Sequence, residues 1–375
     1  RMSTEETIYR PGLEGVVAGE TEICSVEQGG LWYRGYGIQD LAEHASFEEC
    51  AFLLLHGKLP TSNELQMFRS FLDGHRQLPG PVVDAIRGIP RHAEPMDVLR
   101  SAVSMYGHFD TTRGSSRDAM ICQATGILAA VPSIIAARLR LLDGKEIVEP
   151  EEGLSHAAQF LHMAFGRAPS DLEARILNLT LILYAEHEFN ASTFAARVCT
   201  STLSDLYSSV VAAIGTLKGP LHGGANEEAI KLIQRFSSAD EAREWTEDAL
   251  RRKVKIMGFG HRVYKNGDHR AHILENHIED LARARNELWR VAVYHAIKNT
   301  VWEQKQLYPN LDFPCGLIYH LLGLPIDIYT PLFVASRVSG WCAHIIEQRE
   351  NNRIIRPRSR YIGPKPRTWV PIDVR

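Results

Sequence analysis

Hydrophobic spacing is the feature that most constrains the fold of this chain. From residue 40 onwards apolar residues recur at intervals of three and four, the period of a helix, and the alternation that marks a strand is missing. Gly and Pro separate successive segments. We therefore predict a mainly α architecture, with helices at residues 40–56, 96–109, 117–142, 151–165, 171–188, 192–216, 227–236, 239–252, 271–285, 287–306 and 330–350.

Two local signals refine this architecture. Residues 21–36 form two short β runs around Gln28-Gly29-Gly30, which predicts a small hairpin near the N-terminus. Thr61 or Ser62 is expected to cap a further helix, and Glu64 completes a capping box if Thr61 holds the cap.

Length and helix breakers predict two domains. At 375 residues the chain exceeds what one hydrophobic core usually serves. Lys218-Gly219-Pro220 breaks the helical pattern, and the prolines between residues 309 and 314 break it again. We predict a large helical domain of residues 1–217 and 315–375, with a small helical domain of residues 218–314 inserted into it.

Composition excludes several classes of protein. A net charge of -3 gives no general attraction for nucleic acid or an anionic membrane surface. The longest nearly apolar run, residues 124–137, contains Pro132 and is shorter than the roughly 20 residues of a membrane span, so none is predicted. The six scattered cysteines indicate reduced thiols, and we see no secretory signal. A cytoplasmic location is expected.

The stretch from Met257 to Arg270 concentrates polar chemistry around a glycine turn. Gly258 and Gly260 permit a left-handed backbone or the close approach of a ligand. His261 and the cations that follow it offer hydrogen-bond donors for carboxylate or phosphate oxygens. Taken alone, the stretch fits a polar surface loop before a helix equally well.

Several phrases together resemble the citrate synthase family over nearly the whole chain. They are Leu217-Lys-Gly-Pro-Leu-His-Gly-Gly-Ala-Asn-Glu227, Met257-Gly-Phe-Gly-His-Arg-Val-Tyr-Lys265 and Arg353-Ile-Ile-Arg-Pro-Arg358, in order and at workable spacing. The resemblance implies the two-domain helical fold of that family. It also implies an acyltransferase of the tricarboxylic acid cycle, which condenses acetyl-CoA with oxaloacetate and water to citrate and CoA.

The resemblance assigns three catalytic residues. Asp312 matches the base that removes a proton next to the thioester. His222 matches the donor that stabilises the enol or enolate as it forms, and His261 matches the residue that polarises the ketone. His222 precedes a helix that we expect Asn226 to cap, and a helix N-terminus disfavours imidazolium. A lone histidine beside two glycines is otherwise typical of a helix cap.

Oxaloacetate has two carboxylates and a ketone, so its pocket needs paired cations and a donor. By resemblance His187 is a further donor, and Arg270, Arg337 and Arg356 hold the carboxylates in the bidentate geometry that arginine favours. Spacing alone favours a structural interpretation of both, with Arg337 as a helix-surface cation and Arg356 as one charge of a solvated tail. In the family the tail arginine reaches the neighbouring subunit, so a homodimer is expected.

The resemblance implies no permanently bound cofactor, with acetyl-CoA as a cosubstrate. The expected CoA contacts are Lys255, Ile256, Met257, Gly258, Phe259, Gly260, Arg262 and Lys265. Exposed loop charges are the alternative interpretation of the three cations among them.

Departures from the family pattern leave the acyl group open. His269 replaces the usual proline after Asp268, which frees Asp268 from that restriction. Pro314 and Cys315 follow Phe313 where the family commonly has Tyr-Ser, and Pro314 should bias Phe313 to an extended conformation. One methylene discriminates by only about 1–3 kcal/mol, so 2-methylcitrate synthase, which uses propionyl-CoA, is the alternative. A catalytically silent relative that binds CoA or a dicarboxylate is a remote one.

Three histidines near one another do not predict a metal site. His269, His272 and His277 lack a Cys or carboxylate that would complete a ligand set, and the resembling family needs no metal.

Overall fold

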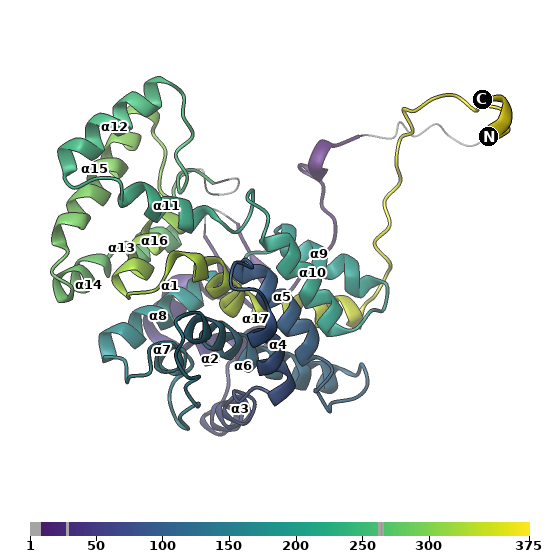
Figure 1. The fold of residues 1–375 in the computed structure, drawn as a ribbon, viewed down its shortest axis with the longest axis horizontal. Helices are drawn as coiled ribbons and strands as arrows, with labels where there is room; N and C mark the ends of the chain where they lie inside the picture. The colour runs from purple at the N-terminus through teal and green to yellow at the C-terminus, as the bar shows by residue number, and fades with distance from the viewer. Residues whose placement is uncertain (1–8, 28–29, 262–263, 265) are drawn as a thin grey trace.

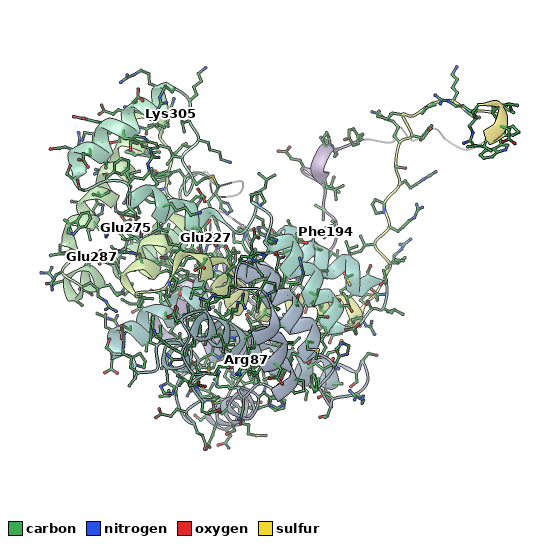
Figure 2. The ribbon with its side chains drawn as sticks, viewed as in Figure 1. Arg87, Phe194, Glu227, Glu275, Glu287 and Lys305 are labelled. Carbon is green, nitrogen blue, oxygen red and sulfur yellow. The ribbon has the colours of Figure 1, made fainter. Side chains whose placement is uncertain are left out.

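The computed structural model describes residues 9–27, 30–261, 264 and 266–375. It confirms the mainly helical architecture. A body of helices carries a lobe formed by α11 to α16, and residues 351–375 leave the body as an extended tail (Figure 1). Glu275 and Lys305 mark this lobe in Figure 2. The helices of the body are α1 (Ile38–His44), α2 (Phe47–His56), α3 (Ser62–Gly74), α4 (Gly80–Gly88), α5 (Pro95–Tyr106), α6 (Arg117–Leu142), α7 (His156–Phe165), α8 (Asp171–Tyr184), α9 (Ala191–Ser201), α10 (Leu206–Leu217) and α17 (Tyr329–Glu350).

The lobe comprises α11 (Ala225–Ile233), α12 (Ala239–Arg251), α13 (His269–Glu275), α14 (Ile278–Ala284), α15 (Leu288–Lys305) and α16 (Asp312–Leu321). Within it α12 packs on α15, and α16 packs on α11, α13 and α14. The domain bounds of 218–314 stay a prediction.

Two long helices form the centre of the body. α6 is buried from Ala124 to Arg138, and α17 is buried from Tyr329 to Ile346. A helix that is apolar around its whole circumference belongs in a core, and these two pack against each other. By length and composition alone α6 could also cross a membrane, but 83% of its apolar window is buried by other helices, which is typical of a core helix.

The expected hairpin is present and has one more strand. β1 (Cys24–Ser25) pairs antiparallel with β2 (Trp32–Tyr33), which pairs with β3 (Tyr36–Gly37). The Tyr33 hydroxyl donates to the carbonyl of Ile182 at 3.0 Å. This carbonyl also accepts the backbone N–H of Ala185 at the end of α8, so the Tyr33 hydroxyl ties the small sheet to the last turn of that helix.

Several predicted helices are divided or shifted. Residues 40–56 form α1 and α2, because Ser46 caps a new helix with a capping box to Glu49. Residues 192–216 form α9 and α10, separated by Asp205 as the next cap, and residues 271–285 form α13 and α14. The sequence interpretation also missed α4 and α16. The Thr61 cap and its Glu64 capping box are confirmed.

Two local predictions are wrong. Asn226 does not cap α11: the cap position is Gly224, and Asn226 is buried in the first helical turn with no side-chain partner. Phe313 is not extended, because α16 begins at Asp312 and Pro314 lies in its first turn. Proline is tolerated there, since the first-turn N–H groups have no intrahelical acceptor.

Candidate active site

Asp312 is the first residue of α16, in a partly buried position at the junction of the lobe and the body. Its Oδ1 accepts a hydrogen bond from the Tyr184 hydroxyl at 2.7 Å. Its backbone N–H donates to Oδ1 of Asn310 at 3.1 Å. Burial raises the pKa of Asp312 above its ordinary value, and the Tyr184 hydrogen bond offsets part of that rise. A carboxylate in such surroundings is a stronger proton acceptor than one in water.

Tyr184 ends α8 and links Asp312 to α17. Its carbonyl accepts a hydrogen bond of 2.6 Å from Nε of Arg337. Its ring lies 4.5 Å from that of Phe333, which in turn lies 6.3 Å from the ring of His222. The base predicted from the sequence and the predicted enol donor therefore share one aromatic wall.

His222 lies in the turn between α10 and α11, and Ser192 determines which of its ring nitrogens carries the proton. The Ser192 backbone N–H donates to Nε2 of His222 at 3.3 Å, and the Ser192 hydroxyl lies 2.9 Å from the same nitrogen. Because Nε2 accepts, the proton of the neutral ring is on Nδ1. Burial, followed by the charge of Arg337, lowers the pKa of His222 to about 4. The ring is thus a neutral donor, and burial rather than the helix N-terminus is the cause.

His187 and His261 lie together, as the sequence interpretation expects. Their ring centroids are 5.1 Å apart, and Nε2 of His187 lies 3.0 Å from the Tyr264 hydroxyl. The Tyr264 backbone N–H donates to Nδ1 of His261 at 3.4 Å, which leaves the other ring nitrogen as a donor. Burial, then the charge of Arg270, lowers the pKa of His187 well below its ordinary value. A neutral ring there suits a ketone oxygen better than a free anion.

Arg270 and Arg337 are both buried beside this histidine pair, at 5% and 2% exposure. Arg270 and Arg337 each lower the pKa of His187, and each also acts on Asp312, so their charges converge on one region. Arg270 forms a two-point ion pair with Asp268, which N-caps α13. Buried guanidinium groups exclude the helix-surface interpretation of Arg337.

Arg356 is not part of this cluster. It is exposed in the extended tail, where its one recorded hydrogen bond is a 3.5 Å contact to the carbonyl of Pro357. The tail leaves the body (Figure 1). Within one chain, therefore, only Arg270 and Arg337 of the three expected arginines lie near His187 and Asp312.

The predicted CoA loop packs against the segment that leads into Asp312. Gly258 and Gly260 have φ values of 90° and 76°, so the glycines are required there. The N–H of Gly260 donates to the carbonyl of Tyr308, and the N–H of Asn310 donates to the carbonyl of Gly258, each at 2.9 Å. A pocket of about 160 Å³ lies beside this pair of segments, lined by Gly260, His261, Tyr264, Asp268, Gln306, Leu307, Tyr308 and Pro309.

The remaining predicted CoA contacts differ in exposure. Lys255 is exposed, Ile256 is buried, and Met257 and Phe259 are partly buried. Arg262 and Lys265 lie outside the described residues. In the part of the chain that the structure describes, no group of three or more His, Cys, Asp or Glu side chains is placed to hold a metal ion.

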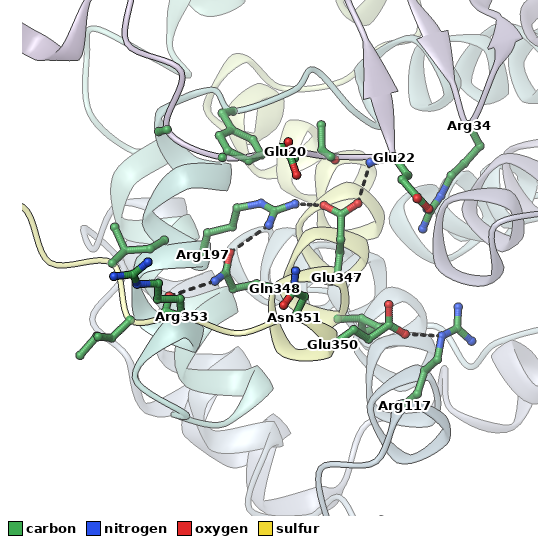
Figure 3. Close-up of a pocket in the computed structure, with 17 residues that line it drawn as sticks. Glu20, Glu22, Arg34, Arg117, Arg197, Glu347, Gln348, Glu350, Asn351 and Arg353 are labelled. Carbon is green, nitrogen blue, oxygen red and sulfur yellow. Dashed lines mark hydrogen bonds and ion pairs between the residues drawn. The ribbon is translucent and has the colours of Figure 1, made fainter.

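A larger polar pocket of about 590 Å³ lies outside the cluster. It is lined mainly by residues 18–22, which precede β1, and by the end of α17 with the residues that follow it (Figure 3). Arg117 pairs with Glu350 at its edge, at 2.7 Å, and Arg197 pairs with Glu347. None of the predicted site residues lines it.

Sequence reasoning missed the roles of four residues that shape the cluster. Three of them, Tyr184, Ser192 and Tyr264, form hydrogen bonds to site residues, and the fourth, Asp268, forms an ion pair with Arg270. Tyr184 follows a run of buried apolar residues at the end of α8 and carries a hydroxyl. That pattern in the sequence could have indicated a polar contact at this position. Ser192 contacts His222 through both its hydroxyl and its backbone N–H, and the sequence carries no signal for the backbone contact.

The helical fold, with a carboxylate of raised pKa, histidines of lowered pKa and buried arginines gathered in one region, fits an acyl-transferring enzyme. The chain belongs to the citrate synthase family: residues 12–358 match the family model described as "Citrate synthase, C-terminal domain". Enzymes of this family are acyltransferases that condense acetyl-CoA with oxaloacetate.

Its relatives carry two names. A 2-methylcitrate synthase of Shewanella oneidensis is 47% identical over 100% of both chains. A citrate synthase of Haloferax volcanii is 44% identical over 97% of this chain and 98% of its own. The structure of a ternary complex of carboxymethyl coenzyme A and oxaloacetate with citrate synthase from Thermoplasma acidophilum has a TM-score of 0.91 and 36% identity. That match covers 97% of this chain and 98% of the other.

Proposed function

We propose that this enzyme condenses acetyl-CoA with oxaloacetate and hydrolyses the resulting thioester, releasing citrate and CoA. The observation that carries the proposal is the series of contacts that leads from Asp312 through Tyr184 and Phe333 to the neutral ring of His222. A base and a neutral donor on one wall are what enol formation at a thioester requires.

The steps assign one task to each group. Asp312 takes a proton from the carbon next to the thioester, while Nδ1–H of His222 donates to the thioester oxygen that gains charge. The enol carbon then attacks the ketone carbon of oxaloacetate, and His261 with His187 supplies donors for the ketone oxygen. Water finally adds to the thioester carbonyl, the carbon–sulfur bond breaks, and CoA leaves with a proton on sulfur.

Oxaloacetate binding is assigned to the buried arginines. Arg270 and Arg337 already lie within the electrostatic range of His187, so they are available for the two carboxylates. We propose that Arg356 completes the pocket of a second copy in a homodimer, because in its own chain the tail carries it away from the cluster. The ternary complex of the 36% identical Thermoplasma acidophilum enzyme supports the same pair of substrates.

The CoA assignment rests on the glycine loop. Its positive-φ glycines bring backbone close to the pocket of about 160 Å³, and Lys255 is exposed at its start. The bounds of the small domain, 218–314, and a cytoplasmic location belong to the same proposal. The six cysteines, all free, support a reducing compartment.

Propionyl-CoA is the second candidate cosubstrate, which would give 2-methylcitrate. Relatives named 2-methylcitrate synthase reach 47% and 46% identity, compared with 44% and 43% for relatives named citrate synthase. The acyl group must fit beside Asp312, where Tyr184 and Phe333 form the wall.

Release of free thiol with oxaloacetate and either acyl-CoA tests both candidates. A higher kcat/KM with acetyl-CoA supports citrate formation, and a higher value with propionyl-CoA replaces it with the second candidate. No release with either acyl-CoA, together with calorimetric binding of CoA or oxaloacetate, would indicate a silent relative.

A further inference from the structure

We infer that Glu186, His344 and Arg197 form a buried relay that positions His187 for its substrate, and we call this set the Glu186 relay. The three side chains are 0%, 0% and 3% exposed. They come from the loop after α8, from α17 and from α9. The inference rests on the proposed function, because the substrate in question is the ketone that His187 is proposed to bind.

The relay begins at the backbone of His187. Oε1 of Glu186 accepts a hydrogen bond from the His187 N–H at 2.8 Å, and Oε2 contacts Nε2 of His344. Nε of Arg197 can only donate, so Nδ1 of His344, at 2.9 Å, must accept. The proton of His344 is therefore on Nε2, where it donates to Glu186. Each member has one hydrogen-bonding role that its neighbours fix.

The outer end of the relay is anchored at the polar pocket of about 590 Å³ (Figure 3). Nη1 of Arg197 donates to Oε1 of Gln348 at 3.0 Å, and Nη2 donates to Glu347. Oε1 of Glu347 accepts the Glu22 N–H at 2.7 Å. All three guanidinium nitrogens of Arg197 are thus engaged, so the relay has little freedom to reorient.

The loop that carries His187 is clamped from two further sides. The Glu186 N–H donates to the Tyr33 hydroxyl at 3.3 Å. α17 approaches so closely at Gly340 that a Cβ there would lie 2.4 Å from the Ala185 carbonyl oxygen. These contacts fix the backbone of Ala185 and Glu186. The hydrogen bond from the His187 N–H to the Glu186 carboxylate then fixes the orientation of the His187 backbone.

None of the relay members has a task in the proposed steps. Glu186, His344 and Arg197 do not contact His222, Asp312 or Arg270 through any recorded hydrogen bond of the described residues. Their hydrogen bonds end at His187, a proposed oxaloacetate donor, and the charge of Glu186 also acts on Arg337, a proposed oxaloacetate cation. They are therefore assigned as positioning residues, whose loss should weaken oxaloacetate binding more than turnover.

Replacements with defined hydrogen-bonding roles test the relay. Glu186→Gln keeps an acceptor for the His187 N–H, but its amide N–H₂ faces the Nε2–H of His344, so two donors meet. His344→Phe removes both links. His344→Gln keeps one donor and one acceptor and should restore the relay. His156→Phe is the matched control, because His156 is buried and lies 3.2 Å from Nη1 of Arg76 but has no link to His187.

The KM for oxaloacetate should rise about tenfold or more in Glu186→Gln and His344→Phe, with kcat changed less than about threefold. In His344→Gln the KM for oxaloacetate should stay within about twofold of wild type. In His156→Phe this KM should not change, even if the melting temperature falls. Equal loss in both His344 variants, or an equal rise in the His156 variant, would overturn the relay.

A second measurement separates the relay from the proposed function. If the wild-type enzyme neither binds oxaloacetate nor releases CoA, the proposed function fails by itself. Long-range ¹H–¹⁵N spectra of labelled histidines still report the proton of His344, without any substrate. A proton on Nε2 in the wild type, with a changed His187 signal in Glu186→Gln, supports the relay, and a proton on Nδ1 overturns it.

Discussion

Asp268 holds the guanidinium of Arg270 in a fork, in which Oδ1 accepts from Nε at 3.0 Å and Oδ2 accepts from Nη2 at 2.9 Å. The same Oδ2 accepts the backbone N–H of Leu311 at 3.1 Å. One buried carboxylate therefore ties a proposed substrate cation to the residue before the proposed base. With His269 in place of the family's proline, Asp268 is still held by these bonds and caps α13.

Asp268→Asn should lower kcat/KM for oxaloacetate by about tenfold or more, because the amide cannot accept both guanidinium bonds and leaves a buried cation without its charge partner. Steady-state kinetics with varied oxaloacetate measures it. Asp280→Asn, an exposed acidic residue on α14, is the control and should behave as wild type. An Asp268 variant with unchanged kinetics would contradict this role.

Asp312→Asn should bind oxaloacetate normally and lose turnover by at least about a hundredfold, since an amide cannot take the proton. Calorimetry gives the binding constant, and thiol release gives the rate. Rates like those of wild type would reject Asp312 as the base.

The acid limb of kcat/KM should belong to Asp312. Its pKa is raised, so the carboxylate loses its charge, and the enzyme its activity, as pH falls through a value above the ordinary 3.8. The Tyr184 hydrogen bond lowers that pKa, so Tyr184→Phe should move the limb to higher pH. A pH–rate profile of both enzymes decides, and a limb that stays in place in Tyr184→Phe would exclude the proposed link.

His222 should make folding stability depend on pH. Its pKa is about 4 in the folded state against 6.5 as a model value, so between these values the unfolded chain binds more protons. Stability is then fully present above pH 6.5 and falls as pH drops toward 4, by at most on the order of 3 kcal/mol. Denaturant titrations at pH 7 and pH 4.5 give the loss in free energy of unfolding between these pH values. The loss should be smaller in His222→Gln than in the wild type, and an equal loss in both would count against the assignment.

Gly258→Ala should destabilise the enzyme by about 1–3 kcal/mol. Its φ is 90°, and the added Cβ would lie 2.9 Å from Cβ of Phe313. Phe313 follows the proposed base, so turnover should fall as well. Gly74→Ala, at the exposed end of α3 with open space around it, is the control. Thermal unfolding compares the two variants, and equal melting temperatures would show that the close approach is not real.

Sequence reasoning succeeded where chemistry is local. The capping box at Thr61 and Glu64 and the full extent of α6 follow from patterns of a few residues, and the structure confirms them. Breaks such as Ser46 inside an apolar stretch were missed because hydrophobic spacing continues across them. The Asn226 cap failed because a buried turn can use glycine at the cap position instead.

For the site, the sequence predicted several of the side chains that lie together but not the residues that hold them in position. His187, His261 and Arg270 are found together as expected. The proton positions on His222 and His344 depend on partners 30 and 147 residues away, so only folded contacts determine them. Arg356 stays a prediction, since its expected target lies in another copy.

The pairing of Gly258 and Gly260 with Tyr308 and Asn310 also sets limits on recombining this chain with a relative. A chimera that exchanges one segment and keeps the other would pair segments from two different proteins beside Asp312, the proposed base. Crossover points are therefore safest before residue 257 and after residue 312, so that loop and base are inherited as one block.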